Sequence, residues 1–226
     1  MLRIINSDGD IIYPGDFIDV MERSGMVVHV GYLVIEKCCA LIQQLKPYLT
    51  EGFPIPLSVN VSAIQFSQED FVPQVARILA KYNIAPGEIH FEITESVSAL
   101  NNKKVIATMQ QLTQLGPIAL DDFGTGYSSL SYLSTMPVDI VKIDRSFVSQ
   151  LPEDTSSTAI LKAVLYVCRV FGMTTVAEGV ETAEQAFYLK QSGCNIFQGY
   201  YYSKPMPTED FIAMVISRAN KLSHTA

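Results

Sequence analysis

Two adjacent aspartates, Asp121 and Asp122, have the most distinctive chemistry in this sequence. They follow an apolar run at residues 117–120 and precede a glycine-containing segment at residues 123–126. Neighbouring carboxylates repel each other, so a cation or several hydrogen-bond donors must lie close by if both are to stay ionised. We therefore expect a metal site here. The alternative is that one aspartate caps the next helix and the other is solvated.

Further polar residues stand at or near the ends of other apolar runs and would complete such a site. They are Asn60, Glu92, Lys142, Asp144, Glu178 and Gln198. Carboxylate and amide oxygens suit Mg²⁺ or Mn²⁺, whereas the three histidines are too scattered along the chain to suggest a zinc site. A carboxylate shared by two cations about 3.5–4 Å apart is the arrangement that activates water for phosphodiester hydrolysis.

Lys142 is the only cation among these residues. Its ammonium group would neutralise charge on phosphoryl oxygens or orient an attacking water. An equally acceptable interpretation is a partly buried lysine that pairs with its neighbour Asp144. Both interpretations are open at this stage.

Short β-branched runs alternate along the chain with amphipathic helical windows. The expected strands lie at residues 57–61, 89–93, 117–121, 138–143, 174–178 and 195–199. The expected helices lie near residues 15–24, 27–46, 68–83, 101–115, 128–135, 156–171, 181–192 and 208–221. This pattern predicts an α/β fold with a parallel sheet, and the polar strand ends favour a TIM-type (β/α)₈ barrel. An open doubly wound sheet is the alternative, but its GxGxxG fingerprint is absent.

The number of strands is too small for a closed barrel, which needs eight. Residues 2–5 resemble the tail of a further strand, and a polar turn follows at residues 6–10. We therefore expect a modified barrel that lacks its first strand and part of its second. Either upstream residues are missing, or a partner covers the open edge of the sheet.

Composition limits the class of protein. The chain has 226 residues, 48% hydrophobic content and a formal charge of −7, which argues against binding to nucleic-acid polymers. No linker or low-complexity segment divides residues 1–226, so one domain is expected. The four cysteines lack metal-site spacing and indicate a reducing compartment, the cytoplasm by default. The apolar stretch at residues 159–177 contains Lys162 and Arg169, which argues against membrane contact by this domain.

Six motifs occur along the chain, in the segments at residues 58–62, 91–96, 121–130, 141–144, 177–182 and 198–207. In order and spacing they resemble the EAL-domain family over essentially the whole chain. Members of this family are bacterial phosphodiesterases that convert cyclic di-GMP to linear pGpG, using Mg²⁺ or Mn²⁺ on a modified TIM barrel. Some members are catalytically inactive receptors.

The resemblance implies a role for each matching residue. It implies that two metal ions are held by Asn60, Glu92, Asp121 and Asp122, with Asp121 shared between them. The catalytic residues that it implies are Glu178 as general base or water-held ligand, Lys142, and Asp144 as an acidic neighbour. The implied substrate-binding residues are Arg3, Gln198 and Glu181, although Glu181 fits equally well as a first-turn residue that interacts with a helix dipole. Loop movement coupled to homodimer formation would involve Glu95, Phe123, Gly124, Thr125 and Gly126.

One departure from the family concerns the start of the chain. The Glu-Ala-Leu segment that names the family would place its glutamate just before Met1, outside this sequence. Loss of an anionic ligand weakens a two-metal site, so we expect weak or no turnover from this chain alone. The alternatives are a cyclic di-GMP receptor or interaction module, and another metal-dependent barrel enzyme with a lysine base. The resemblance also allows an upstream sensory or cyclase-like domain, through which the full-length protein could be anchored in a membrane.

Overall fold

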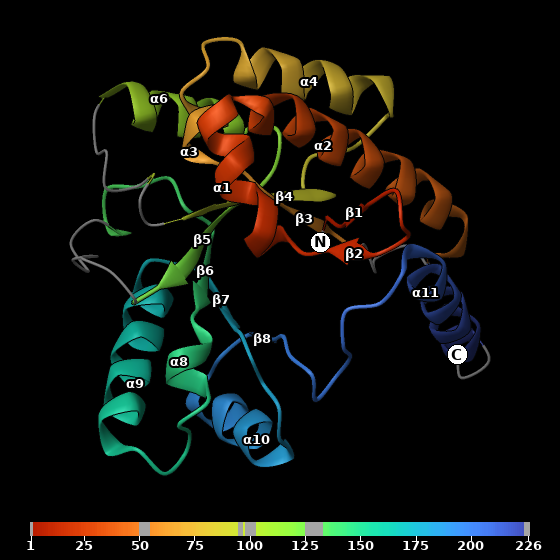
Figure 1. Ribbon diagram of the computed structural model, residues 1–226. Helices are drawn as coiled ribbons and strands as arrows, with labels where there is room; N and C mark the ends of the chain where they lie inside the picture. Colours follow the sequence, from red (N-terminus) through yellow and green to blue (C-terminus); the bar gives the residue numbers. More distant parts are fainter. Residues whose placement is uncertain (1, 50–54, 95–96, 98–102, 125–132, 224–226) are drawn as a thin grey trace. The chain divides into compact units, whose positions relative to one another are not determined.

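The computed structural model describes residues 2–49, 55–94, 97, 103–124 and 133–223. The chain divides into two compact units, one comprising Met1–His90 with Pro205–Ala226 and the other Phe91–Lys204. Each unit is described by itself below (Figure 1). The expectation of one domain over residues 1–226 stays a prediction.

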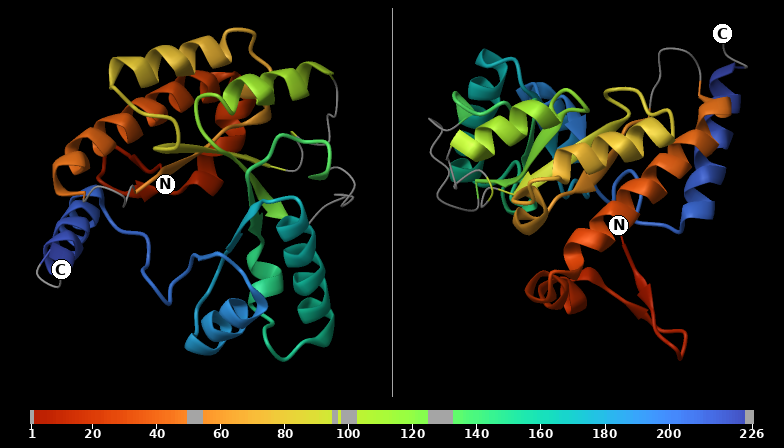
Figure 2. Two further views of the ribbon diagram at one scale, coloured as in Figure 1. Left: turned by 180° about the vertical axis from the view of Figure 1, so that it is seen from behind. Right: turned by 90° about the horizontal axis from the view of Figure 1, so that it is seen from above.

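The first unit is mainly helical. Its strands are β1 (Ile4–Ile5), β2 (Ile11–Ile12) and β3 (Leu57–Asn60). Its helices are α1 (Pro14–Ser24), α2 (Met26–Leu45), η1 (Lys46–Tyr48), α3 (Ala63–Phe66), α4 (Phe71–Lys81) and α11 (Thr208–Ser223). Helix α2 packs against α1 and α4, and α2 and α4 run side by side in both views of Figure 2. Gly25 has a φ of 74°, which lets one residue end α1 and begin α2.

The structure corrects the prediction for residues 2–5. Strand β1 pairs with β2 in a separate antiparallel hairpin, with Ile5 opposite Ile11. The Asn6 side-chain oxygen accepts hydrogen bonds from the backbone N–H groups of Asp8 and Asp10, at 3.0 and 2.8 Å. The chain reverses at this point, so residues 4–5 are not a strand of the parallel sheet.

Helix α2 with η1 is long and apolar enough to cross a membrane by length and composition alone. Its buried residues, however, recur every three or four positions, as in a core helix packed on one side. They are Val27, Gly31, Ile35, Cys39, Ile42 and Leu45. The spacing fits the packing of α2 within the first unit.

The second unit contains most of the parallel sheet, whose strand order is β3-β4-β5-β6-β7-β8. Strand β4 (Ile89–Thr94) begins in the first unit, and β5 (Ile118–Phe123), β6 (Ile140–Ile143), β7 (Thr174–Ala177) and β8 (Ile196–Phe197) follow. Each neighbouring pair from β4 to β8 is parallel, and all six expected strands are present. This confirms the α/β class.

Helices connect the parallel strands of the second unit. They are α6 (Lys103–Leu112), α8 (Arg145–Val148), α9 (Thr155–Val170) and α10 (Ala183–Ser192). The apolar spacing of α9 buries Leu161, Leu165 and Cys168, and this helix packs on β7. The helix expected near 128–135 falls mostly outside the described residues. Parallel strands joined by helices bring the C-terminal ends of the strands to one edge of the sheet, which is where the polar residues lie.

Candidate metal centre

The two adjacent aspartates lie at a bulge in β5. Leu120 pairs with Val141 and Phe123 pairs with Ile143, so β5 has one residue more than β6 between these two pairs. Asp122 has a φ of 54°, in the left-handed region that aspartate tolerates better than most residues. Consecutive side chains of a regular strand point to opposite faces, but a bulge redirects one of them. The bulge therefore allows both carboxylates to reach one site.

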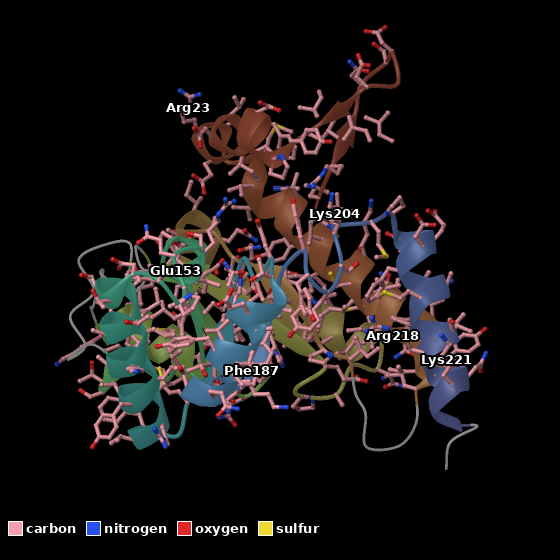
Figure 3. All side chains as sticks on the ribbon, turned by 90° about the horizontal axis from the view of Figure 1, so that it is seen from below. Arg23, Glu153, Phe187, Lys204, Arg218 and Lys221 are labelled. Carbon is pink, nitrogen blue, oxygen red and sulfur yellow. The ribbon has the colours of Figure 1, made fainter. Side chains whose placement is uncertain are left out.

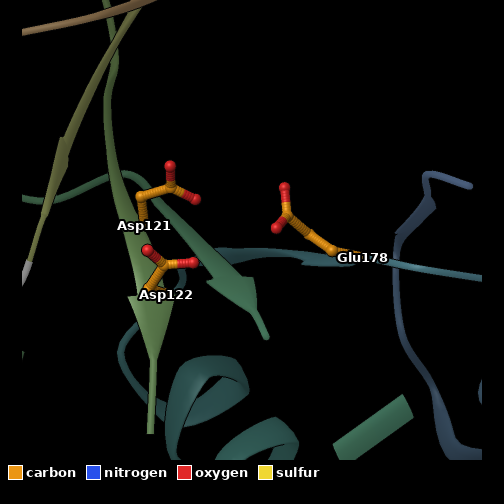
Figure 4. A group of neighbouring side chains, drawn as sticks. All are labelled: Asp121, Asp122 and Glu178. Atoms are coloured by element: carbon orange, nitrogen blue, oxygen red, sulfur yellow. The ribbon is translucent and has the colours of Figure 1, made fainter. Parts of the chain in front are cut away.

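The carboxylates of Asp121, Asp122 and Glu178 form a cluster. Each offers an oxygen, and these oxygens all lie within 4.8 Å of one another. Figure 4 shows the Glu178 side chain directed toward the two aspartates. Three carboxylates at this separation are able to share a cation, and oxygen ligands fit Mg²⁺ or Mn²⁺.

Lys142 links the carboxylates of this centre. Its Nζ atom lies 2.7 Å from Glu178, 2.8 Å from Asp121 and 3.0 Å from Glu92. The lysine comes from β6, and its carboxylate partners come from β4, β5 and the residue after β7. This favours the neutralising role for Lys142 over pairing with Asp144, because the ammonium lies against these three carboxylates and the Asp144 carboxylate accepts from the Ser146 N–H instead.

Burial and the neighbouring charges have opposite effects on the pKa values of the residues at this centre. Lys142 is only 5% exposed, and burial alone would lower its pKa, but the carboxylates of Glu92, Asp121 and Glu178 outweigh burial and raise it. Burial raises the pKa of Glu178, an effect that Lys142 opposes. With Asp122 included, four carboxylates against one ammonium leave a formal charge of −3 when all are ionised. A divalent cation would compensate much of this charge, so these residues fit the metal that the sequence predicts.

Three buried apolar residues lie on the same strands as the charged groups, and we call this cluster the hydrophobic floor of the centre. They are Ala119, Ile140 and Val176. These three residues are buried together, and each stands two positions before Asp121, Lys142 or Glu178 respectively. Residues two apart on a strand face the same side, so the strands that carry the charged groups also supply the floor. Apolar surroundings strengthen electrostatic interactions within the site.

Glu178 is held by the backbone of strands on both sides. Its N–H donates to the Ile143 carbonyl at 3.1 Å, from the side of β6. On the side of β8, the Val180 N–H donates to the Gln198 carbonyl at 3.0 Å, and the Gln198 N–H donates to the Ala177 carbonyl at 2.8 Å. Gln198 therefore helps to fix the segment around Glu178 through its backbone, while the residue as a whole is exposed.

Two predicted site residues have local structural roles in the second unit. The Asp144 carboxylate accepts a hydrogen bond from the Ser146 N–H at 2.9 Å and caps α8. Helix α10 begins at Ala183 after the N-cap Thr182, so Glu181 precedes the helix instead of lying in its first turn. The Glu181 N–H donates to the Gln185 side chain at 2.8 Å. The catalytic and substrate-binding roles of Asp144 and Glu181 stay predictions.

The remaining predicted residues are distributed as follows. Asn60 ends β3 and Arg3 lies over the Tyr13 ring at 4.8 Å, both in the first unit, so the structure does not place them relative to the carboxylates. Phe123 is buried at the end of β5, and Gly124 follows it with a φ of 101°. Glu95, Thr125 and Gly126 lie outside the described residues.

Sequence reasoning missed the residues that support the centre. The floor was detectable, because counting back two positions from each polar strand end gives Ala119, Ile140 and Val176. The contact between the Phe147 ring and the backbone at Gly124 had no such signal, since it joins α8 to the residue after β5, which is distant in sequence.

Comparison with known proteins agrees with this geometry. The EAL domain family matches residues 1–205. The signaling protein YkoW of Bacillus subtilis is 34% identical over 222 residues, which are 98% of this chain and 27% of YkoW. The bifunctional diguanylate cyclase/cyclic di-GMP phosphodiesterase MucR of Pseudomonas aeruginosa is 36% identical over 217 residues, which are 95% of this chain and 31% of MucR.

A solved structure, that of the PaMucR phosphodiesterase in complex with c-di-GMP, is similar with a TM-score of 0.86 and 34% identity. The similarity covers 93% of this chain and 85% of that chain, and it confirms the TIM-type fold. The chain spans 27% and 31% of the lengths of YkoW and MucR, which are larger proteins. On the family match over residues 1–205, this chain belongs to the EAL domain family.

Proposed function

We propose that this protein is a cyclic di-GMP phosphodiesterase that hydrolyses cyclic di-GMP to linear pGpG. The observation that carries the proposal is the buried Lys142 ammonium, held within 3.0 Å of Glu92, Asp121 and Glu178 beside Asp122. A cation-binding carboxylate cluster next to a fixed ammonium suits the attack of water on a phosphodiester. The name of MucR includes this activity, and the similar PaMucR structure holds the dinucleotide.

We assign metal binding to Asn60, Glu92, Asp121 and Asp122, with two Mg²⁺ or Mn²⁺ ions per site. The oxygen ligands and the excess negative charge of the cluster support this assignment. When bound, such ions polarise the phosphoryl group and lower the pKa of a bound water. Substrate contacts are assigned to Arg3, Gln198 and Glu181.

Glu178 accepts the proton of the attacking water. Burial raises the pKa of this carboxylate, which brings it closer to the range in which a general base is effective near neutral pH. The water oxygen forms a bond to phosphorus, the P–O3′ bond breaks, and its electron pair leaves with O3′, which takes up a proton. The Lys142 ammonium stabilises the negative charge that develops on the phosphoryl oxygens.

Chromatographic separation of cyclic di-GMP and pGpG tests the proposal. With Mg²⁺ or Mn²⁺ we expect pGpG to accumulate, and we expect Glu178→Gln to lower turnover at least about 100-fold because the general base is lost. Calorimetry with Ca²⁺ in place of Mg²⁺ should still detect dinucleotide binding by this variant. Binding without turnover by the unaltered protein would indicate a receptor, and absence of both would overturn the proposal.

We also propose that two copies associate through the outer face of α9. Four of its exposed apolar residues, Ala159, Ala163, Tyr166 and Val170, follow a 4-3-4 spacing and share one side of the helix. Tyr166 and Val170 are 62% and 61% exposed. Sedimentation velocity should show a dimer that Tyr166→Glu dissociates and Tyr166→Phe retains. A monomer at all concentrations would contradict this assignment.

A cytoplasmic location is proposed as well. The described cysteines are free thiols, and three of them, Cys39, Cys168 and Cys194, are buried, which suits a reducing compartment. The length of the relatives supports further domains in the full protein, including a sensory or cyclase-like domain.

A further inference from the structure

Helix α8 is a single turn that follows β6, the strand that contains Lys142, and leads into the rest of the second unit. It comprises Arg145–Val148 and begins three residues after Lys142. Asp144 caps its first turn through its side chain, and Val148 is fully buried at its end. The turn therefore has a fixed start and a fixed end, and the residues between them occupy defined positions.

One side of α8 rests on the backbone that follows the two aspartates. A Cβ atom built on Gly124 would lie 2.7 Å from Cε2 and 3.0 Å from Cζ of Phe147. The edge of the ring thus occupies the space that a side chain at position 124 would need. Gly124 comes two residues after Asp122, so the ring limits how far this end of β5 is able to move.

The same turn contacts the backbone that follows Glu178. A Cβ atom built on Gly179 would lie 2.6 Å from Cβ and 3.3 Å from Cα of Arg145. Gly179 has a φ of 69°, so glycine is favoured there both by backbone conformation and by the close approach. Arg145 thus limits the position of Glu178 from the other side of α8.

We propose that α8 is a spacer that sets the separation between the Asp121–Asp122 pair and Glu178. Phe147 and Arg145 are positioning residues, and Asp144 acts through α8 by capping it. The contacts of Phe147 with Gly124 and of Arg145 with Gly179 exist whatever the protein does. The inference rests on the proposed function in one respect, which is that the carboxylates bind metal. The carboxylate oxygens lie within 4.8 Å of one another, so a small displacement of either side changes their fit to one cation.

The Phe147→Ala variant tests the spacer. We expect its affinity for Mn²⁺, measured by electron paramagnetic resonance titration of the whole chain, to fall about 10-fold, as for other residues that orient metal ligands. A crystal structure of the metal-free variant should show the oxygens of Asp121 or Asp122 and Glu178 more than 4.8 Å apart. Unchanged affinity with unchanged separation would overturn the proposal.

Two control variants separate positioning from loss of stability. Phe187 lies on α10 (Figure 3) and is 66% exposed, so Phe187→Ala should change neither Mn²⁺ affinity nor Tm. Leu161 is fully buried in α9, and Leu161→Ala should lower Tm while leaving Mn²⁺ affinity within about twofold. An equal loss of Mn²⁺ affinity in Leu161→Ala and Phe147→Ala would show that Phe147 acts only through the overall stability of the fold. That outcome would contradict the proposal that α8 is a spacer.

A compensating pair of substitutions tests the contact directly. Gly124→Ala should weaken Mn²⁺ binding because its methyl group collides with the Phe147 ring edge. Adding Phe147→Leu removes the ring edge and should restore part of the affinity, with the remainder lost to the strained φ at position 124. Additive losses in the double variant would show that the two residues do not act through this contact.

Substitutions of Asp144 distinguish capping of α8 from a direct role for the negative charge of this residue. Asparagine still accepts the cap hydrogen bond, whereas alanine does not, so Asp144→Ala should weaken Mn²⁺ binding more than Asp144→Asn does. Equal losses would indicate a direct role for the negative charge and overturn the capping role. The Mn²⁺ affinities and the distance between the carboxylate oxygens are measured without any assay of hydrolysis. Failure of the proposed function would be detected separately, as the absence of pGpG.

Discussion

The Nζ atom of Lys142 lies 2.7 Å from an Oε atom of Glu178; the lysine lies in β6, and the glutamate directly follows the neighbouring parallel strand β7. Both side chains are largely buried, with 6% and 17% of their surfaces exposed. A buried ion pair is costly to form but more costly to break, because removal of one partner leaves the other charged and unpaired. The centre is therefore sensitive to the loss of the Lys142 ammonium.

Replacement of Lys142 by methionine should destabilise the metal-free protein by about 3–5 kcal/mol, because three carboxylates lose their common partner. Urea unfolding in the presence of EDTA measures the loss. The double variant Lys142→Met with Glu178→Gln should recover part of it, since one uncompensated charge is removed. A loss below about 1 kcal/mol would show that the carboxylates are protonated or solvated when Lys142 is absent.

Addition of Mg²⁺ should stabilise the protein, because a cation that binds only the folded state shifts the unfolding equilibrium. At 100 times the dissociation constant the gain is about 2.7 kcal/mol. Differential scanning calorimetry with and without Mg²⁺ should show a rise in Tm. The rise should shrink strongly in Asp122→Asn, whose side chain offers a neutral ligand at the bulge. An equal rise in both proteins would place the bound Mg²⁺ elsewhere.

Alkaline pH should destabilise the second unit through Cys168. Burial first, and then the nearby Cys194, raise the pKa of Cys168 from 9.0 to about 11. The folded state therefore keeps its thiol proton to higher pH than the unfolded state. This contribution is complete below pH 9 and falls as the pH rises toward 11.

The expected loss from Cys168 is about 1 kcal/mol between pH 8 and pH 10. Urea midpoints at both pH values measure it, with Cys168→Ala as the control, in which the difference between the two pH values should decrease by this amount. The same pH dependence in both proteins would assign it to other groups.

The glycine at position 199 is expected to be essential for stability. A Cβ atom there would lie 2.1 Å from the carbonyl oxygen and 2.3 Å from the nitrogen of Val180, and backbone atoms cannot rotate away. We expect Gly199→Ala to cost at least about 2 kcal/mol and to weaken metal binding through the displaced Glu178 segment. Gly15 in α1 has open space around it, so Gly15→Ala should be neutral or stabilising in the same unfolding experiment.

The sequence predicted the residues of the centre better than their arrangement. Apolar runs ending in Asp121, Lys142 and Glu178 located the strand ends, because parallel strands place such ends at one edge. The bulge was not predictable, since alternation of apolar and polar residues does not reveal one inserted position. The helical windows were close, with α9 observed at Thr155–Val170 against the expected 156–171.

The expectation that residues 2–5 end a strand of the parallel sheet was wrong for a local reason. Residues 4–5 have strand propensity but pair within a hairpin, because the Asn6 turn returns the chain beside them. For Asp144 the structure adds a local role that the sequence did not indicate, because its carboxylate accepts a hydrogen bond from the first turn of α8, and its catalytic role stays a prediction. Local hydrogen bonds of aspartate and asparagine compete with longer-range roles, and sequence patterns alone do not reveal which one prevails.

The bulge in β5 also determines how many negative charges one strand is able to deliver. A strand with strict alternation offers each face of the sheet every second residue, and so one of two adjacent aspartates. With its extra residue, β5 offers both to the same place, opposite Glu178. Deletion of a single residue at this point would restore the alternation, so β5 would direct one aspartate to the site instead of two. The other residues of the centre would still be present in the sequence.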